Sequence, residues 1–309
     1  MHQNVCCVCH TPLAESARSI GRRYYCDLHY SRVTQDRRGI WLSTLVGILA
    51  LLLFVGLVAL ILNLAQPTLS GTPLALVGIV LAVVPAVIWL GVFYRQDRLE
   101  AEPKRYVLSI FVLGAILAVG VGIPVLRDLF RVQDWLDSAG TLVNILGTIL
   151  VVGFVQEYLK YAGVRFTIFG SPEFDERVDG IVYGAAMGLG FATMLNIQYV
   201  IGHGGVQLGV GVMRITITAL AQASFAGVSG YFLGRAKFED MPIWWLPAGV
   251  TLAATLNAIV TFLLQEVSMQ GLQFTPAYGL VLAAVVAGAT FAVLFALIRR
   301  INAATLADA

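Results

Sequence analysis

The sequence predicts an all-α membrane protein, a bundle of about eight transmembrane helices with a small cysteine-containing module in front of it. Three observations lead to this fold class. The 309-residue chain is 58% hydrophobic and only 12% charged, which is about half the charged fraction of an average soluble protein. Several apolar runs reach the ~20 residues that a helix needs to cross a bilayer. All 4 cysteines precede the first of these runs.

Eight apolar runs separated by polar loops predict the membrane-spanning helices. Together with the segments that flank them, they divide the chain into a module over residues 1–38, a transmembrane domain over residues 39–303 and a short cytoplasmic tail over residues 304–309. The expected spans are residues 41–65, 73–94, 106–124, 141–163, 180–202, 208–233, 243–264 and 277–298.

The basic residues lie almost entirely on one side of the expected bundle. Of the 20 Lys and Arg residues, seventeen fall on one side: in the N-terminal segment, in the loops after the second, fourth and sixth spans, at the C-terminal end, and, in the case of Lys160, at the end of the fourth span that adjoins its loop. Only Arg127 and Arg131 fall on the opposite side, and Arg214 lies inside a span. Cytoplasmic loops carry an excess of Lys and Arg, so we expect both termini in the cytoplasm.

The cysteines form two pairs with the spacing of metal ligands. Cys6 and Cys9 enclose two residues, and Cys26 and His29, which follow after sixteen further residues, enclose two more. Each pair can close a tight turn around one ion, and a small hairpin between them would bring the pairs together. Three thiolates and one imidazole suit a tetrahedral structural zinc site, and the cytoplasm disfavours the alternative of disulfides.

The sequence therefore predicts a small cytoplasmic zinc-finger-like module with zinc as a structural cofactor. Cys7 and His10 have the same spacing as Cys6 and Cys9, so the first ligand pair stays open between them. The module is not expected to bind nucleic acid. Its arginines lie close to the first span, where they can contact membrane lipids.

Four segments of the membrane part occur in a characteristic order and spacing. They are DRLEAEPKR (97–105), QEYLK (156–160), VDGIVYGAAMGLGFATMLNIQYV (178–200) and RITITALAQASFAGVSGYFLG (214–234). Together they resemble the PrsW family of intramembrane proteases, from about Asp97 to Leu264. The resemblance implies an intramembrane peptidase fold in a bacterial or archaeal plasma membrane.

The resemblance also implies a set of ionisable positions. The family pattern has two glutamates at the end of the fourth span, a glutamate before an asparagine in the fifth, a histidine in the sixth, and a histidine and an aspartate four apart in the seventh. Five of these six groups are replaced here, and only Glu157 remains, with Lys160 three residues later. The matching positions are Gln156, Glu157, Leu195 (before Asn196), Gln222, Asn257 and Thr261.

Glu157 and Lys160 can pair because side chains three residues apart lie on the same side of a helix. Their place near the cytoplasmic end of the fourth span suggests an interfacial ion pair whose charged ends reach water. The other interpretation is that Glu157 is a remaining catalytic carboxylate.

Arg214 lies several residues inside the sixth span, toward the outer leaflet, where an unpaired charge is costly. We expect it to pair with Asp134 or Asp137 in the outer loop, to reach a lipid phosphate, or to contact a ligand.

The replaced positions favour a PrsW-like pseudoprotease that has lost its peptidase chemistry. Its expected partners are membrane lipids and a transmembrane or membrane-associated client protein. An active endopeptidase that uses Glu157 is the first alternative. A transporter or channel is the second, and the small number of ionisable residues within the spans speaks against it.

Overall fold

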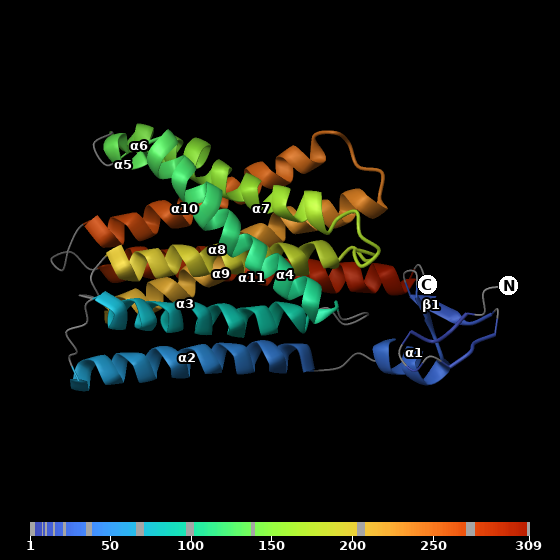
Figure 1. The fold of residues 1–309 in the computed structure, drawn as a ribbon. Helices are drawn as coiled ribbons and strands as arrows, with labels where there is room; N and C mark the ends of the chain where they lie inside the picture. The colour runs from blue at the N-terminus through green and yellow to red at the C-terminus, as the bar shows by residue number, and fades with distance from the viewer. Residues whose placement is uncertain are drawn as a thin grey trace.

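The computed structural model describes residues 4–307 apart from residues 8, 10, 15, 21–22, 35–38, 66–70, 97–101, 137–139, 203–207 and 270–275. It is a bundle of long helices with a small module of two strands and one helix at one end. The N-terminal module and the C-terminal end of the last helix lie at the same end of the bundle (Figure 1).

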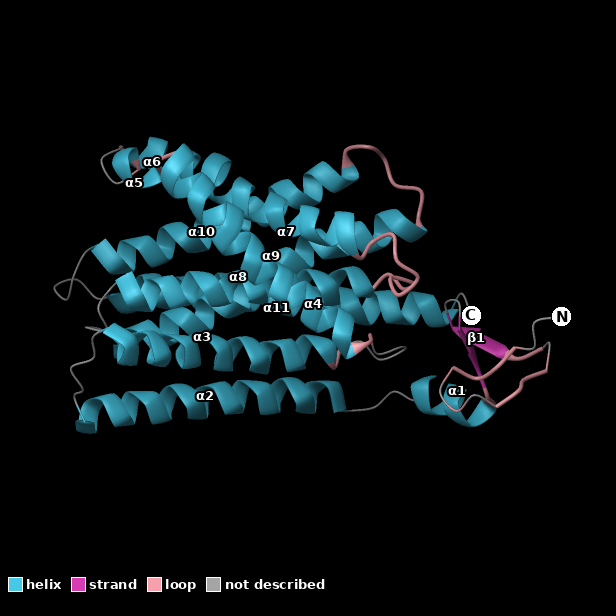
Figure 2. Ribbon diagram, in the orientation of Figure 1, coloured by secondary structure: helices cyan, strands magenta, loops and turns pink. Residues whose placement is uncertain are grey.

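Among the described residues, strands occur only in the N-terminal module (Figure 2). In chain order they are β1 (Arg18–Ile20), β2 (Arg23–Tyr25), α1 (Asp27–Thr34), α2 (Gly39–Ala65), α3 (Gly71–Tyr94), α4 (Lys104–Leu117), η1 (Ala118–Gly122), η2 (Val125–Leu129), α5 (Val132–Trp135), α6 (Thr141–Gly147), η3 (Thr148–Gly153), α7 (Phe154–Thr167), α8 (Asp179–Gly202), α9 (Leu208–Phe238), α10 (Trp245–Met269) and α11 (Pro276–Ala307). The three η segments are π-helical.

The helices confirm the predicted fold class. Within the described residues, 7 helical segments are long and apolar enough to cross a membrane, and α2 adds a shorter apolar stretch, Thr44–Val58, at the position of the first predicted span. Five segments run beyond their predicted ends. The third predicted span continues through η1 and η2 to Leu129, and α7, α9, α10 and α11 end at Thr167, Phe238, Met269 and Ala307. Composition marks where an apolar run ends, and a helix can continue into the polar residues that follow.

The centre of the bundle is α8, which contacts α3, α4, α7 and α9 and is buried along most of its length. Gly184 and Gly188 let α9 approach closely, as small residues at this spacing do in membrane helices. A Cβ atom on Gly184 would lie 2.4 Å from Ala226 O, and one on Gly188 would lie 2.2 Å from Gln222 O. This close contact fixes where the backbone of Gln222 lies against α8.

The N-terminal module is held by a short antiparallel hairpin. Strand β1 pairs with β2 so that Arg18 lies opposite Tyr25 and Ile20 opposite Arg23. Ile20 and Tyr25 are buried, and Cys7 packs against them. This hairpin lies between the two ligand pairs, as predicted, and it brings them to one point.

Candidate functional site

The four predicted metal ligands converge in the N-terminal module. One ligand atom from each of Cys6, Cys9, Cys26 and His29 lies within 4.8 Å of the other three. Among the described residues, this is the one such group of His, Cys, Asp and Glu side chains. Cys7 instead packs against the hairpin, and His10 lies outside the described residues. The arrangement could therefore hold a metal ion through the first pair, Cys6 and Cys9.

The distances agree with a tetrahedral site. Cys26 Sγ lies 3.9 Å from Cys9 Sγ and 3.1 Å from His29 Nδ1, and Cys6 Sγ lies 3.6 Å from the same nitrogen. Ligands at about 2.3 Å from a tetrahedral zinc are separated from each other by about 3.8 Å. A sulfur–sulfur distance of 3.9 Å is far longer than the ~2.05 Å of a disulfide.

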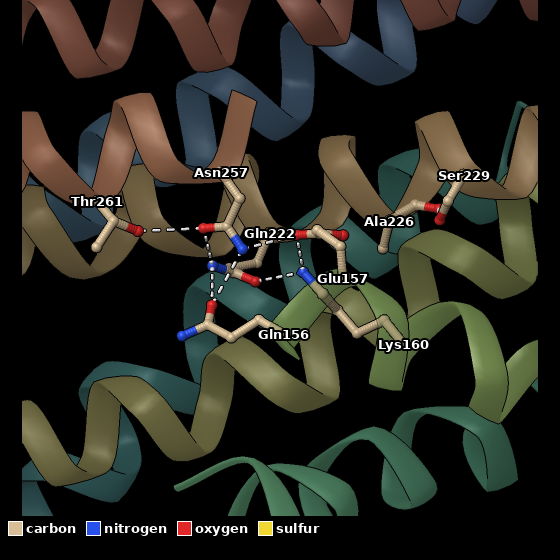
Figure 3. Close-up of polar contacts among 8 residues, drawn as sticks. All are labelled: Gln156, Glu157, Lys160, Gln222, Ala226, Ser229, Asn257 and Thr261. Carbon is tan, nitrogen blue, oxygen red and sulfur yellow. Dashed lines mark hydrogen bonds and ion pairs between the residues drawn. The ribbon is translucent and has the colours of Figure 1, made fainter. Parts of the chain in front are cut away.

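A second group of polar side chains lies inside the membrane bundle. Six residues from three helices, α7, α9 and α10, form one hydrogen-bonded network (Figure 3). All but Thr261 are buried. The six are Gln156, Glu157, Lys160, Gln222, Asn257 and Thr261.

Close packing of η3 against α10 brings the polar residues of α7 and α10 together. A Cβ atom on Gly153, the last residue of η3, would lie 2.4 Å from Ala254 O, so η3 and α10 touch at this glycine. Gln156 and Asn257 each follow three residues later on their own helix, and Asn257 Nδ2 lies 3.0 Å from Gln156 Oε1. The π-helical segment η3 directly precedes α7. Such segments are rare and often occur at functional sites.

Lys160 connects the charged part of the network, Glu157, to its neutral amide groups. Its Nζ donates a hydrogen bond to Glu157 Oε1 and another, of 2.5 Å, to Gln222 Oε1. The aromatic ring of Phe191, on α8, lies 5.6 Å from Nζ, within cation–π range. The ammonium therefore has a carboxylate, an amide oxygen and a ring face around it.

The amides bind one another around this ion pair. Asn257 Nδ2 donates to Glu157 Oε1 at 2.7 Å, and Gln222 Nε2 donates to Asn257 Oδ1 at 3.1 Å and to Gln156 Oε1 at 3.3 Å. Thr261 Oγ1 donates to Asn257 Oδ1 at 3.1 Å. The second carboxylate oxygen, Glu157 Oε2, is buried and has no hydrogen-bond partner among the described residues.

The expected interfacial position of Glu157 and Lys160 is wrong. Their side chains have 0% exposure and form their ion pair inside the bundle. Helical spacing shows that the two can pair, but it does not show whether their common face points to lipid, to water or to other helices. Here α9 and α10 cover that face with Gln222 and Asn257.

The fifth-span positions of the family pattern do not join this network. Leu195 is half-buried and offers no polar atom. Asn196 is buried, and its Nδ2 donates to Ile215 O of α9 at 3.1 Å. The residue through which α8 meets the network is Phe191, which the sequence did not single out, because an aromatic residue on an apolar helix carries no functional signal.

Arg214 packs against an aromatic ring, and one of its expected partners, Asp134, pairs elsewhere. Its guanidinium carbon lies 3.9 Å from the centre of the Tyr199 ring, a cation–π contact between α9 and α8. Asp134 pairs with Arg131 at 2.5 Å instead, because Arg131 lies three residues earlier, at the N-terminal cap of the short helix α5 that carries Asp134. Asp137, the other expected partner, lies outside the described residues.

A carboxyl group that the sequence did not single out lies at the start of α4. Glu102, in the loop before α4, is 3% exposed, and its Oε2 accepts a hydrogen bond of 2.6 Å from Tyr183 OH of α8. Burial raises the pKa of Glu102 to about 7, although the Tyr183 hydrogen bond acts in the opposite direction. The signal in the sequence is a glutamate directly before Pro103, inside the segment DRLEAEPKR.

The membrane network offers little acid–base chemistry. Glu157 and Lys160 are its two ionisable members, and they are bound to each other. The amides and the hydroxyl of Thr261 can hold a water molecule or a peptide group, but they do not take up a proton near neutral pH.

Comparison with known proteins agrees with this fold. A family model described as PrsW family intramembrane metalloprotease matches residues 102–289. Protease PrsW of Bacillus subtilis is 30% identical over 189 residues, 60% of this chain and 82% of that protein. Protease PrsW of Geobacillus kaustophilus is 33% identical over 157 residues, 50% of this chain and 65% of that protein. No solved structure matches the chain.

The matched region contains α4 to α10 and with them all six residues of the membrane network. It also covers more than half of the chain. The N-terminal module and its four converging ligands lie before it. From Glu102 onward, the chain belongs to the PrsW family of intramembrane metalloproteases.

Proposed function

We propose that this chain is a pseudoprotease of the PrsW family, a protein that binds membrane-embedded clients without cleaving them. One observation carries the proposal: the single carboxylate of the membrane network, Glu157, is buried and bound through one oxygen to Lys160 and Asn257. The remaining positions of the family pattern within the network are neutral amides and a hydroxyl.

Hydrolysis of a peptide bond needs a base beside the attacking water and an acid beside the leaving nitrogen. A positioned second acid or base contributes typically 10²–10⁴-fold to the rate. In this network Lys160 is the acid nearest to Glu157, and its ammonium already donates to Glu157 and Gln222. A proton held in this way stabilises the ion pair, so it is poorly placed for a leaving group.

Client binding is supported by the amide groups. Gln156 accepts two hydrogen bonds at its oxygen and directs its nitrogen away from the other labelled side chains (Figure 3). An amide nitrogen at this position can donate to a polar group of a neighbouring transmembrane segment. A hydrogen bond between membrane helices contributes about 0.6–2 kcal/mol, enough to orient a client that packing holds.

The second candidate is an active endopeptidase, and Glu157 Oε2 is the observation that favours it. This oxygen has no partner among the described residues and can accept a proton from a water molecule. A lone carboxylate would give slow cleavage at best, because no second acid or base is placed to protonate the leaving nitrogen.

Cleavage in reconstituted vesicles separates the two candidates. The substrates are transmembrane peptides that the Bacillus subtilis relative cuts under the same conditions, so that the relative serves as the positive control. We expect no product from this chain. Product from the wild type that disappears with Glu157→Ala would overturn the pseudoprotease and identify Glu157 as catalytic.

Binding needs its own measurement. Photo-cross-linking from position 156 in native membranes should capture a transmembrane protein, whereas a cross-linker at the lipid-facing Leu150, which is 68% exposed, should capture mainly lipid. Equal protein capture at both positions would mean that the network does not select a client.

We propose further that the N-terminal module binds one structural zinc ion and lies in the cytoplasm with the C-terminus. The ligand geometry supports zinc, and the distribution of basic residues supports the orientation. A reporter enzyme active only outside the cytoplasm, fused after Ala309, should stay inactive. Activity of that reporter would place the C-terminus outside and contradict the orientation.

A further inference from the structure

The description of the family implies a metal ion at the catalytic site, and the residues present here can be tested against that implication. Catalytic zinc sites in proteins have three protein ligands, drawn from histidine, cysteine and carboxylates. The membrane network supplies one residue of these types, Glu157. The positions where the family pattern has two histidines and an aspartate carry Gln222, Asn257 and Thr261.

The amide oxygens of the network already accept hydrogen bonds. Gln156 Oε1 accepts from Asn257 and Gln222, and Asn257 Oδ1 accepts from Gln222 and Thr261. A carbonyl oxygen has two lone pairs, so both of these oxygens are saturated. Gln222 Oε1 accepts from the Lys160 ammonium. The hydroxyl of Ser229, two turns further along α9, donates to Ala226 O at 2.9 Å (Figure 3).

Glu157 Oε2 is the one buried carboxylate oxygen of the network without a partner, and it does not make a metal site. Its sister oxygen already accepts a hydrogen bond from Lys160 Nζ. A divalent cation on Oε2 would lie next to that ammonium in an apolar bundle, where the repulsion between like charges is weakly screened. The donor set therefore does not fit a metal ion.

We propose that Lys160 Nζ is itself the cation of this site, coordinated by Glu157 and Gln222, and that the membrane domain of this chain binds no metal ion. Metal in the chain is then held by the N-terminal cluster alone. The inference rests on the proposed function in one respect, that the network is not a working metallopeptidase site. The inference is tested by measuring bound metal, whereas the proposed function is tested by measuring cleavage.

The first test is the metal stoichiometry of the full-length protein in detergent, stripped with a chelator under reducing conditions and titrated with Co²⁺ alone. We expect about one equivalent, with the strong absorption of cobalt bound to thiolates, and none after Cys9→Ser together with Cys26→Ser. A second site without thiolate absorption, present in both proteins and lost with Glu157→Gln, would overturn the proposal. Because the wild type alone reveals such a site, the test does not depend on the folding of the cysteine variant.

The second test asks whether the ammonium stands in the place of a cation. Lys160→Met removes it and leaves the buried Glu157 carboxylate without a positive charge beside it. Millimolar Mn²⁺ should then raise the unfolding temperature of Lys160→Met by at least about 2 °C. It should leave the wild type and the double variant Glu157→Gln with Lys160→Met unchanged. A shift of the wild type equal to that of Lys160→Met, or no shift of Lys160→Met, would refute the role of Lys160.

The two proposals fail in different ways. Cleavage by a chain that binds metal only at its N-terminal cluster would refute the pseudoprotease and leave the metal-free site standing. Stoichiometric metal at Glu157 in a chain that does not cleave would refute the metal-free site and leave the pseudoprotease standing.

Discussion

Asn257 Nδ2 lies 2.7 Å from Glu157 Oε1. An amide of α10 therefore donates a hydrogen bond to the single carboxylate of the buried network, which belongs to α7. The two residues are 100 positions apart in the chain, and each belongs to a helix that crosses the membrane. The contact means that the charge of Glu157 is stabilised by two donors on different helices, Lys160 and Asn257. A substitution of either donor should therefore lower the stability of the protein, because it leaves the Glu157 charge with one donor fewer.

Removing the ammonium while keeping the carboxylate should destabilise the bundle strongly. Breaking one partner of a buried ion pair costs about 3–5 kcal/mol, because the other charge is left uncompensated. We expect Lys160→Met to lower the free energy of unfolding by an amount in this range. Glu157→Gln together with Lys160→Met should recover most of the loss, since it removes both charges.

The measurement is a double-mutant cycle of reversible unfolding in bicelles, with Lys104→Met as the control. Lys104 is an exposed lysine at the start of α4, and its replacement should change the free energy of unfolding by less than about 0.5 kcal/mol. Additive effects of the two site variants would show that Glu157 and Lys160 do not interact in the folded protein.

A methyl group at Gly188 should separate α8 from α9. The Cβ of Gly188→Ala would lie 2.2 Å from Gln222 O, a backbone atom that cannot rotate away. Overpacking of this kind costs typically 1–3 kcal/mol, and it should also shift Gln222 away from Lys160. At Gly91 on α3 an added Cβ meets no atom within 4 Å.

Thermal unfolding of both variants checks this prediction. Gly91→Ala should be neutral or should stabilise the helix by up to about 1 kcal/mol, whereas Gly188→Ala should unfold at a lower temperature. Equal unfolding temperatures for the two variants would contradict the close approach of the helices.

The fold was largely predictable from the sequence, and the environment of the charges was not. Apolar length and basic loops are properties of one segment at a time, so all eight spans could be placed. The face of α7 that carries Glu157 and Lys160 depends on α9 and α10, which belong to other parts of the chain. Their sequences show that Gln222 and Asn257 are polar, but only the resemblance to a family indicated that they meet.

Local contacts were predicted better than distant ones for the same reason. The four metal ligands lie within one short stretch of the chain, and their spacing alone was enough to predict that they meet. They are Cys6, Cys9, Cys26 and His29. Arg214 needed a partner from another element, and the outer loop offered several acids. The structure gives it the ring of Tyr199, a contact between α8 and α9 that no spacing rule predicts.

Glu102 should make the stability of the protein depend on pH. Its pKa is raised to about 7 in the folded protein from the ordinary value of 4.5 for a glutamate, so the folded state holds the proton more tightly than the unfolded state. Its contribution is therefore complete below pH 4.5 and is lost as the pH rises toward 7. Glu102→Gln should remove this part of the pH dependence.

The comparison is the difference in unfolding temperature between the wild type and Glu102→Gln at several pH values from 4.5 to 8. Glu239, whose pKa is lowered by hydrogen bonding to Arg235, is the matched control, because its contribution is lost in the opposite direction, as the pH falls. A wild-type minus Glu102→Gln difference that does not vary with pH would show that Glu102 is not perturbed.

Removal of metal should unfold the N-terminal module and leave the membrane bundle intact. The hairpin of β1 and β2 has two fully buried hydrophobic residues, Ile20 and Tyr25, a core too small to hold a fold without a further constraint. A structural zinc supplies that constraint, because its binding energy is available only to the folded module. The core of the bundle lies between membrane helices and does not depend on the module.

Limited proteolysis with and without a chelator measures both parts at once. We expect chelation to make the module susceptible to cleavage while the fragment that contains α2 to α11 stays resistant. Cys26→Ser should behave like the chelated protein. Cys7→Ser should retain its metal and its resistance, because Cys7 packs against Ile20 and Tyr25 and is not one of the four converging ligands. Loss of metal from Cys7→Ser together with retention in Cys6→Ser would assign the first ligand pair to Cys7 and His10 instead.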